Sequence, residues 1–152
     1  MASIRREVSI NVAPDQVWSA LRDVGALHTR LVTGFVTDCR LEGDARVVTF
    51  ANGMVARERI VDIDDSARRV AWAAVGGRMS HHNASAQVFA ESAGGSRVVW
   101  IADLLPNEIA PVIATMIEQG TAAMKRTLEG DAVQKPHLLF AAHSQAIAAA
   151  IE

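Results

Sequence analysis

Residues 81–128 read HHNASAQVFA ESAGGSRVVW IADLLPNEIA PVIATMIEQG TAAMKRTL, and the pattern changes once within them. Two runs, 81–89 and 97–105, flank the turn sequence Ser92-Ala93-Gly94-Gly95-Ser96 and are typical of a β-hairpin. From Glu108 the apolar period changes from two to nearly four. One helical stripe then collects Ile109, Val112, Ile113, Met116, Ile117, Gly120, Met124 and Leu128. Because this stripe needs an apolar surface to cover it, the sequence predicts a long helix lying on a sheet.

The composition of the 152 residues is that of one globular domain. Half of the residues are hydrophobic and the formal net charge is −2, so the chain has no overall attraction to nucleic acid or to an anionic membrane. Cys39 is the only cysteine, which excludes an internal disulfide and a zinc site built on paired cysteines. No segment approaches the roughly 20 apolar residues of a membrane span. We therefore expect a cytoplasmic protein without a nucleic-acid partner or a membrane span.

The chain before residue 81 carries further strand patterns. Residues 6–12 alternate in polarity, Pro14 begins a short helical pattern that ends near Gly25, and a second short helix is expected within 26–33. Turn sequences, among them Gly43-Asp44 and Asn52-Gly53, then separate strand patterns at residues 35–42, 45–51, 54–63 and 69–75. Together with the hairpin after residue 81, they predict seven strands, with an antiparallel meander.

The segment 130–152 differs in character from residues 1–129, which we expect to form the single domain. Gly130 and Pro136 interrupt the helical pattern, and Leu138–Ile151 is rich in alanine. This tail is expected either to form an extra helix or to fray. An extra helix would pack on the domain or on another subunit, as in a homodimer.

Four motifs carry a resemblance to one family: Ala13-Pro14-Asp15-Gln16-Val17-Trp18, Gly53-Met54-Val55-Ala56-Arg57-Glu58-Arg59-Ile60, His82-Asn83-Ala84-Ser85 and Trp100-Ile101-Ala102-Asp103-Leu104-Leu105-Pro106. Their order and spacing resemble the polyketide cyclase/dehydrase-like branch of the START-like superfamily. These SRPBCC proteins are relatives of the birch-pollen allergen. The resemblance implies an α+β helix-grip fold, in which a curved seven-stranded antiparallel sheet wraps a long C-terminal helix and two short helices follow the first strand. It also implies a cavity for a hydrophobic or amphipathic small molecule, although fold does not fix function.

The turn within residues 90–97 decides which side chains face that cavity. If Glu91 pairs with Ser96, odd positions of the first strand share a face with even positions of the second. Related proteins turn the tryptophan of the second strand toward the cavity. The expected ligand-binding residues are therefore Asn83, Ser85, Gln87, Phe89 and Trp100, with Met116 and Gly120 on the helix. A shift of one residue would exchange the two faces and leave the polar row on the solvent side.

Glu58 is the residue for which the sequence suggests the most specific catalytic role. Pairing across Asn52-Gly53 places Thr49 and Val47 on its face of the sheet. Burial raises the pKa of a carboxyl, so Glu58 is a candidate acid or base near neutral pH, with His81 as its partner. The alternative is a structural glutamate that is hydrogen-bonded to the backbone or to an arginine.

Other polar residues give weaker indications. His81 and His82 are neighbours on a strand and point to opposite faces, so no metal site is expected. No cofactor is expected either. The arginines are expected on a solvated outer face of the sheet rather than in a nucleic-acid patch, namely Arg46, Arg57, Arg59, Arg68 and Arg69.

Three functions agree with these patterns. The first is binding of a hydrophobic or amphipathic small molecule, which ranks first because no residue cluster dictates a reaction. The second is a cyclase or dehydratase that acts on a polyketide-like or aromatic substrate, using Glu58 and His81 as acid and base. The third is a non-enzymatic regulatory or assembly subunit that uses Leu138–Ile151 as its contact.

Overall fold

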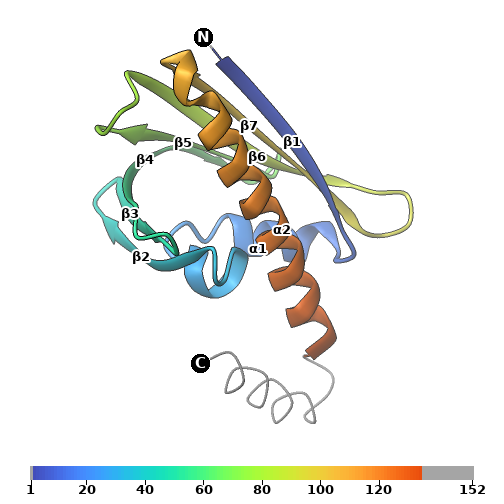
Figure 1. The fold of residues 1–152 in the computed structure, drawn as a ribbon. Helices are drawn as coiled ribbons and strands as arrows, with labels where there is room; N and C mark the ends of the chain where they lie inside the picture. The colour runs from blue at the N-terminus through green and yellow to red at the C-terminus, as the bar shows by residue number, and fades with distance from the viewer. Residues whose placement is uncertain (1, 135–152) are drawn as a thin grey trace.

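The computed structural model describes residues 2–134 (Figure 1). The strands are β1 (Ala2–Ile10), β2 (Val36–Glu42), β3 (Ala45–Phe50), β4 (Val55–Asp64), β5 (Arg69–Val75), β6 (His81–Ala90) and β7 (Ser96–Leu105). They form one antiparallel sheet in the order β1-β7-β6-β5-β4-β3-β2. The helical elements are α1 (Pro14–Leu21), the π-helical turn η1 (Leu27–Leu31), the 3-10 turn η2 (Asn107–Ile109) and α2 (Ala110–Gln134). The predicted α+β helix-grip fold is confirmed.

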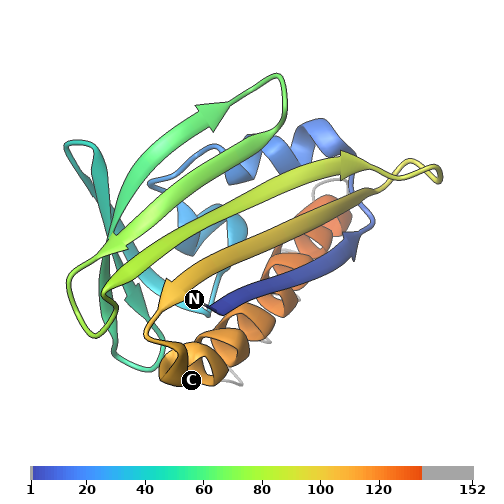
Figure 2. The same ribbon diagram turned by 90° about the horizontal axis from the view of Figure 1, so that it is seen from above.

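Helix α2 lies across the concave face of the curved sheet (Figures 1 and 2). Its buried positions Ile117, Met124 and Leu128 follow the helical stripe of the sequence and are at most 6% exposed. They pack into one core with strand residues such as Ile4 and Ile10. Burying one side chain of this size contributes roughly 1.5–3 kcal/mol, so the stripe is the main reason why α2 stays on the sheet.

Helix α1 is fixed at the end of the sheet by packing and by one polar contact. Pro14 occupies the start of the helix, where its missing N–H removes no helical hydrogen bond. Val17 and Leu21 are buried. The indole N–H of Trp18 donates to Asp65 Oδ1 over 2.9 Å. Because Asp65 lies in the turn between β4 and β5, this bond ties α1 to that turn.

Helix α2 is longer than the sequence indicated. Gly130 was expected to stop it, yet the helix continues to Gln134. A glycine inside a helix costs about 1 kcal/mol relative to alanine and does not by itself end the helix. The tail contact expected at Leu138–Ile151, and with it the expected homodimer, lies outside the described residues. No helix within residues 2–134 is long and apolar enough to cross a membrane.

Two hairpin turns contain three residues each. In the turn between β3 and β4, the Phe50 N–H donates to the Met54 carbonyl over 2.8 Å, and Gly53 has a φ of 88°. Between β6 and β7, the Glu91 N–H donates to the Gly95 carbonyl over 2.9 Å, and Gly94 has a φ of 91°. In each turn a glycine occupies the left-handed position that such three-residue loops require.

Each turn differs by one residue from the expected one, longer in the first hairpin and shorter in the second, so the predicted pairing was wrong in both hairpins. Ala86 pairs with Trp100 in the second hairpin, and Arg46 pairs with Glu58 in the first. In both hairpins, the even-numbered residues of the two paired strands therefore lie on the same face of the sheet. Because side chains alternate along a strand, this shift exchanges the two faces of the partner strands.

Candidate ligand-binding pocket

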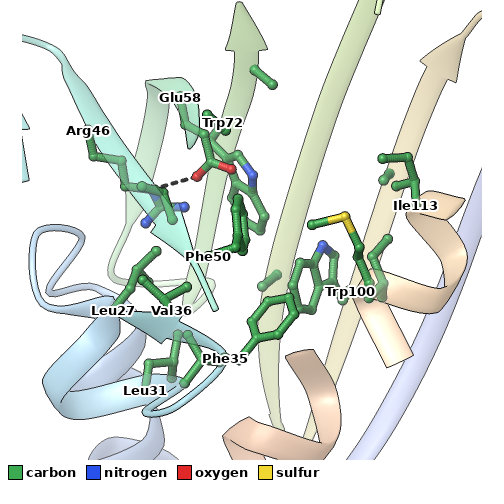
Figure 3. A pocket seen from close by; sticks show the side chains of 18 of the residues that line it. Leu27, Leu31, Phe35, Val36, Arg46, Phe50, Glu58, Trp72, Trp100 and Ile113 are labelled. Carbon is green, nitrogen blue, oxygen red and sulfur yellow. Dashed lines mark hydrogen bonds and ion pairs between the residues drawn. The ribbon is translucent and has the colours of Figure 1, made fainter. Parts of the chain in front are cut away.

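A pocket of about 140 Å³ lies between the concave face of the sheet and α2 (Figure 3). Strands β3 to β7, the segment from η1 to Val36 and the inner face of α2 all contribute side chains to it. Most of the lining is apolar, and α2 supplies Ile113, Met116, Ile117 and Met124. Met54 lines the pocket and is 48% exposed, so the pocket reaches the surface beside the turn between β3 and β4.

Two aromatic pairs form much of the apolar wall. The rings of Trp72 and Trp100 meet edge to face at 5.9 Å, and those of Phe35 and Phe50 at 5.3 Å. Edge-to-face pairs are the favoured geometry for such rings and add stability beyond their buried area. The two pairs present flat apolar surfaces to anything that enters the pocket.

Gly120 has no side chain, and this leaves space for the indole of Trp100 beside α2. A Cβ on Gly120 would lie 2.7 Å from Trp100 Cζ3 and 3.3 Å from Phe35 Cε2. Real Cβ atoms essentially never approach another atom as closely as 2.7 Å. Gly120 therefore lets α2 come close to the indole, and the indole in turn forms part of the pocket wall.

A buried ion pair lies at the other side of the pocket, away from α2 (Figure 3). Arg46 Nε donates to Glu58 Oε1 over 2.8 Å, and the two side chains are only 4% and 12% exposed. The Arg46 Nη1 donates to the Val24 carbonyl over 3.2 Å, and the guanidinium lies 5.2 Å from the centre of the Trp72 ring. The arginine is thus held by hydrogen bonds at two of its nitrogens and by an aromatic face.

His82 is the third polar residue of the lining. Its Nδ1 accepts a hydrogen bond of 2.9 Å from the Ala74 backbone N–H. The neutral ring therefore carries its proton on Nε2. Burial lowers the pKa of His82 below its usual range, although the charge of Glu58 opposes the shift. An imidazole that stays neutral thus accompanies the ion pair in the lining.

The structure brings only part of the predicted site together. Glu58, Trp100 and Met116 line the pocket, and Gly120 stands behind Trp100. His81 is exposed and lies on the opposite face of β6. The expected contact between His81 and Glu58 is therefore absent. The register shift is the cause, because it turns His82 rather than His81 inward.

The expected polar row of β6 faces away from the pocket for the same reason. Asn83, Ser85, Gln87 and Phe89 alternate with Ala84, Ala86 and Val88, which face the core. On the convex face, Gln87 Nε2 donates to the Ala67 carbonyl over 3.1 Å, and the Arg97 guanidinium lies 4.9 Å from the centre of the Phe89 ring. This row therefore contributes to the outside of the sheet.

Arg46 and His82 are the functional candidates that the sequence did not indicate. Arg46 was placed on the solvated outer face, and this was wrong, since the residue is 3% exposed and faces inward. The arginine contact that the sequence left open for Glu58 is present. The alanine row of β6 was the available signal, because Ala84, Ala86 and Val88 match the apolar face of a strand better than the polar row does.

The fold and the site define a START-like protein of the helix-grip class. The chain matches the family described as polyketide cyclase / dehydrase and lipid transport over residues 1–129, and it belongs to that family. The resemblance seen in the sequence is thereby confirmed. No curated protein matches the chain.

Several solved structures share this fold. An uncharacterised protein from Bacillus thuringiensis superposes with a TM-score of 0.75 at 18% identity, covering 84% of this chain and 98% of that one. The protein XoxI from Bacillus cereus gives 0.74 at 20% identity, covering 84% and 96%. A protein from Thermobifida fusca gives 0.67 at 24% identity, covering 86% and 92%. Likeness at these identities establishes a shared fold and no shared activity.

Proposed function

We propose that the protein binds a small hydrophobic or amphipathic molecule in the pocket between the sheet and α2. The observation that carries the proposal is an apolar cavity whose few polar groups are Arg46, Glu58 and His82. Concave, mostly apolar sites with a small number of placed polar groups are the usual form of small-molecule sites. The description of the family, which includes lipid transport, supports the same class of ligand.

The volume of the pocket limits the size of the ligand. A dry cavity of roughly 150 Å³ holds a molecule about the size of benzene, and this pocket has about 140 Å³. A single ring about the size of benzene therefore fits without rearrangement. Larger ligands require movement of the lining, to which Met54, Met79 and Met116 contribute flexible side chains.

Native mass spectrometry of gently purified protein tests the proposal. We expect a discrete small-molecule adduct that is released on denaturation and is lost from a Trp100→Ala variant that still folds. The matched control is Asn83→Ala, which truncates a residue on the convex face and should retain the adduct. An adduct that both variants keep would argue against binding in this pocket.

Acid–base catalysis is a second candidate function, because a carboxylate and a neutral imidazole line the same pocket. In a cyclase or dehydratase reaction, the Nε2 proton of His82 would polarise a substrate carbonyl, and Glu58 would accept a proton from the adjacent carbon. Exchange of the methyl protons of acetophenone in D₂O, followed by NMR, is a simple assay for such a step. Glu58→Gln should abolish exchange while binding is retained. Exchange at the wild-type rate in this variant would rule out a catalytic role for Glu58.

A further inference from the structure

We propose that the pocket selects ligands with an uncharged head group that both donates and accepts hydrogen bonds, such as an amide, a phenol or an alcohol, over the corresponding carboxylates. This inference rests on the proposed binding function and specifies the class of ligand. It concerns the polar groups of the lining, Arg46, Glu58 and His82.

The positive charge of Arg46 is already neutralised. Its Nε is bonded to Glu58 Oε1 over 2.8 Å, its Nη1 to the Val24 carbonyl, and its guanidinium lies against Trp72. An arginine in a pocket often recognises a ligand carboxylate through two parallel hydrogen bonds. Here Glu58 already supplies that carboxylate, so a second one would enter a site in which the charge is balanced.

His82 does not supply a compensating positive charge. Its Nδ1 accepts a hydrogen bond from the Ala74 N–H. Protonation of Nδ1 would replace this hydrogen bond by repulsion between the Nδ1 proton and the Ala74 N–H. The formal charge of Arg46, Glu58 and His82 together is therefore zero. A ligand carboxylate would lose its hydration on entry without gaining an unpaired cation, and it would meet the carboxylate of Glu58 in an apolar environment.

The same residues offer hydrogen bonds to an uncharged head group. Within residues 2–134, Glu58 uses only Oε1 and His82 only Nδ1 in hydrogen bonds. Glu58 Oε2 is thus available as an acceptor, and the Nε2 proton of His82 is available as a donor. A hydroxyl or a primary amide carries both the donor that Glu58 can accept and the acceptor that His82 can use, whereas a carboxylate has no proton to give to Glu58.

An isosteric pair of ligands tests the inference. We would titrate the protein with 4-ethylbenzamide, 4-ethylbenzoate and ethylbenzene at pH 7.5, and follow backbone amide shifts by NMR. The dissociation constant of the amide should be at least about tenfold lower than that of the benzoate. Equal binding of the two, or tighter binding of the benzoate, would overturn the inference.

A Glu58→Gln variant provides a second test of the ligand preference, because it leaves the charge of Arg46 without a counter-charge. The preference for the amide should then shrink by at least about tenfold or reverse. The control is Glu42→Gln, which removes the same charge from an exposed ion pair with Arg57 and should leave the preference unchanged. A preference that Glu58→Gln leaves unchanged, or that both variants change alike, would contradict the inference.

The outcomes separate this inference from the function on which it rests. If ethylbenzene binds and the head groups make no difference, the pocket binds ligands and the inference about selectivity is wrong. If none of the three compounds binds the wild-type protein, both are wrong. The comparison of amide with benzoate uses the wild-type protein alone, so it remains decisive even if Glu58→Gln does not fold.

Discussion

Gly120 on α2 lies against the indole of Trp100, with only 2.7 Å between the position of an added Cβ and Trp100 Cζ3. The helix, the aromatic wall and the volume of the pocket are therefore linked through one residue that has no side chain. A larger residue at this position must displace the ring, and the ring lines the pocket.

Gly120→Ala should lower the free energy of unfolding by up to about 2 kcal/mol, although alanine favours the helix. Overpacking a core costs about 1–3 kcal/mol, and the better helix propensity of alanine returns about 1 kcal/mol. Urea unfolding followed by tryptophan fluorescence measures the difference. The control is Gly130→Ala in the same helix, where an added Cβ meets nothing within 4 Å and a gain of up to about 1 kcal/mol is expected. Equal effects of the two substitutions would contradict the contact with Trp100.

Removing one partner of the buried ion pair should cost more than removing both. Glu58→Leu leaves the guanidinium of Arg46, 4% exposed, without its counter-charge, and such a change typically costs about 3–5 kcal/mol. The double variant Arg46→Met/Glu58→Leu buries no charge and should recover part of that loss. Denaturant titrations of both single variants and the double variant form a thermodynamic cycle. Additive losses would show that the pair is not coupled.

His82 should make the protein less stable in mild acid. Burial lowers its pKa in the folded state below the ordinary 6.5, so the unfolded chain binds more protons as the pH falls through that value. Stability is therefore full above about pH 6.5 and declines toward the folded-state pKa. The groups whose charges act on His82 are Glu58, His81 and Asp103.

The variant His82→Asn isolates this contribution, because its amide oxygen can still accept the Ala74 N–H but does not titrate. The urea concentration at the unfolding midpoint should fall between pH 7.5 and pH 5.5, and this fall should be larger for the wild-type protein than for the variant. A fall of the same size in both would assign the acid sensitivity to other groups.

The strands and the long helix were predictable from the sequence, because their apolar periods are local. The stripe from Ile109 to Leu128 and the alternation around Trp100 required no knowledge of distant contacts. The register was not predictable in the same way. A change of one residue in the length of the turn at Gly53 or Gly94 shifts the pairing by one residue, and that shift decides which face of the strand is buried.

The pocket was harder to predict than the fold. Arg46 and Glu58 meet only because their strands pair in the shifted register. Leu27 and Phe35 also line the pocket, from the π-helical turn and from the loop before β2, and the sequence did not indicate that either residue faces it. Trp100 was expected at the pocket because of the family resemblance, which carries information about the face that one sequence alone does not contain.

The most direct test of ligand binding uses the adjacent alanines of β5. Ala74 lines the pocket, whereas Ala73 lies on the opposite face of the strand. Ala74→Leu should fill space beside His82 and weaken the binding of ethylbenzene, measured by NMR titration, by at least about tenfold. Ala73→Leu adds the same volume on the convex face and should leave the affinity unchanged. Wild-type affinity in the Ala74→Leu variant would contradict binding in this pocket.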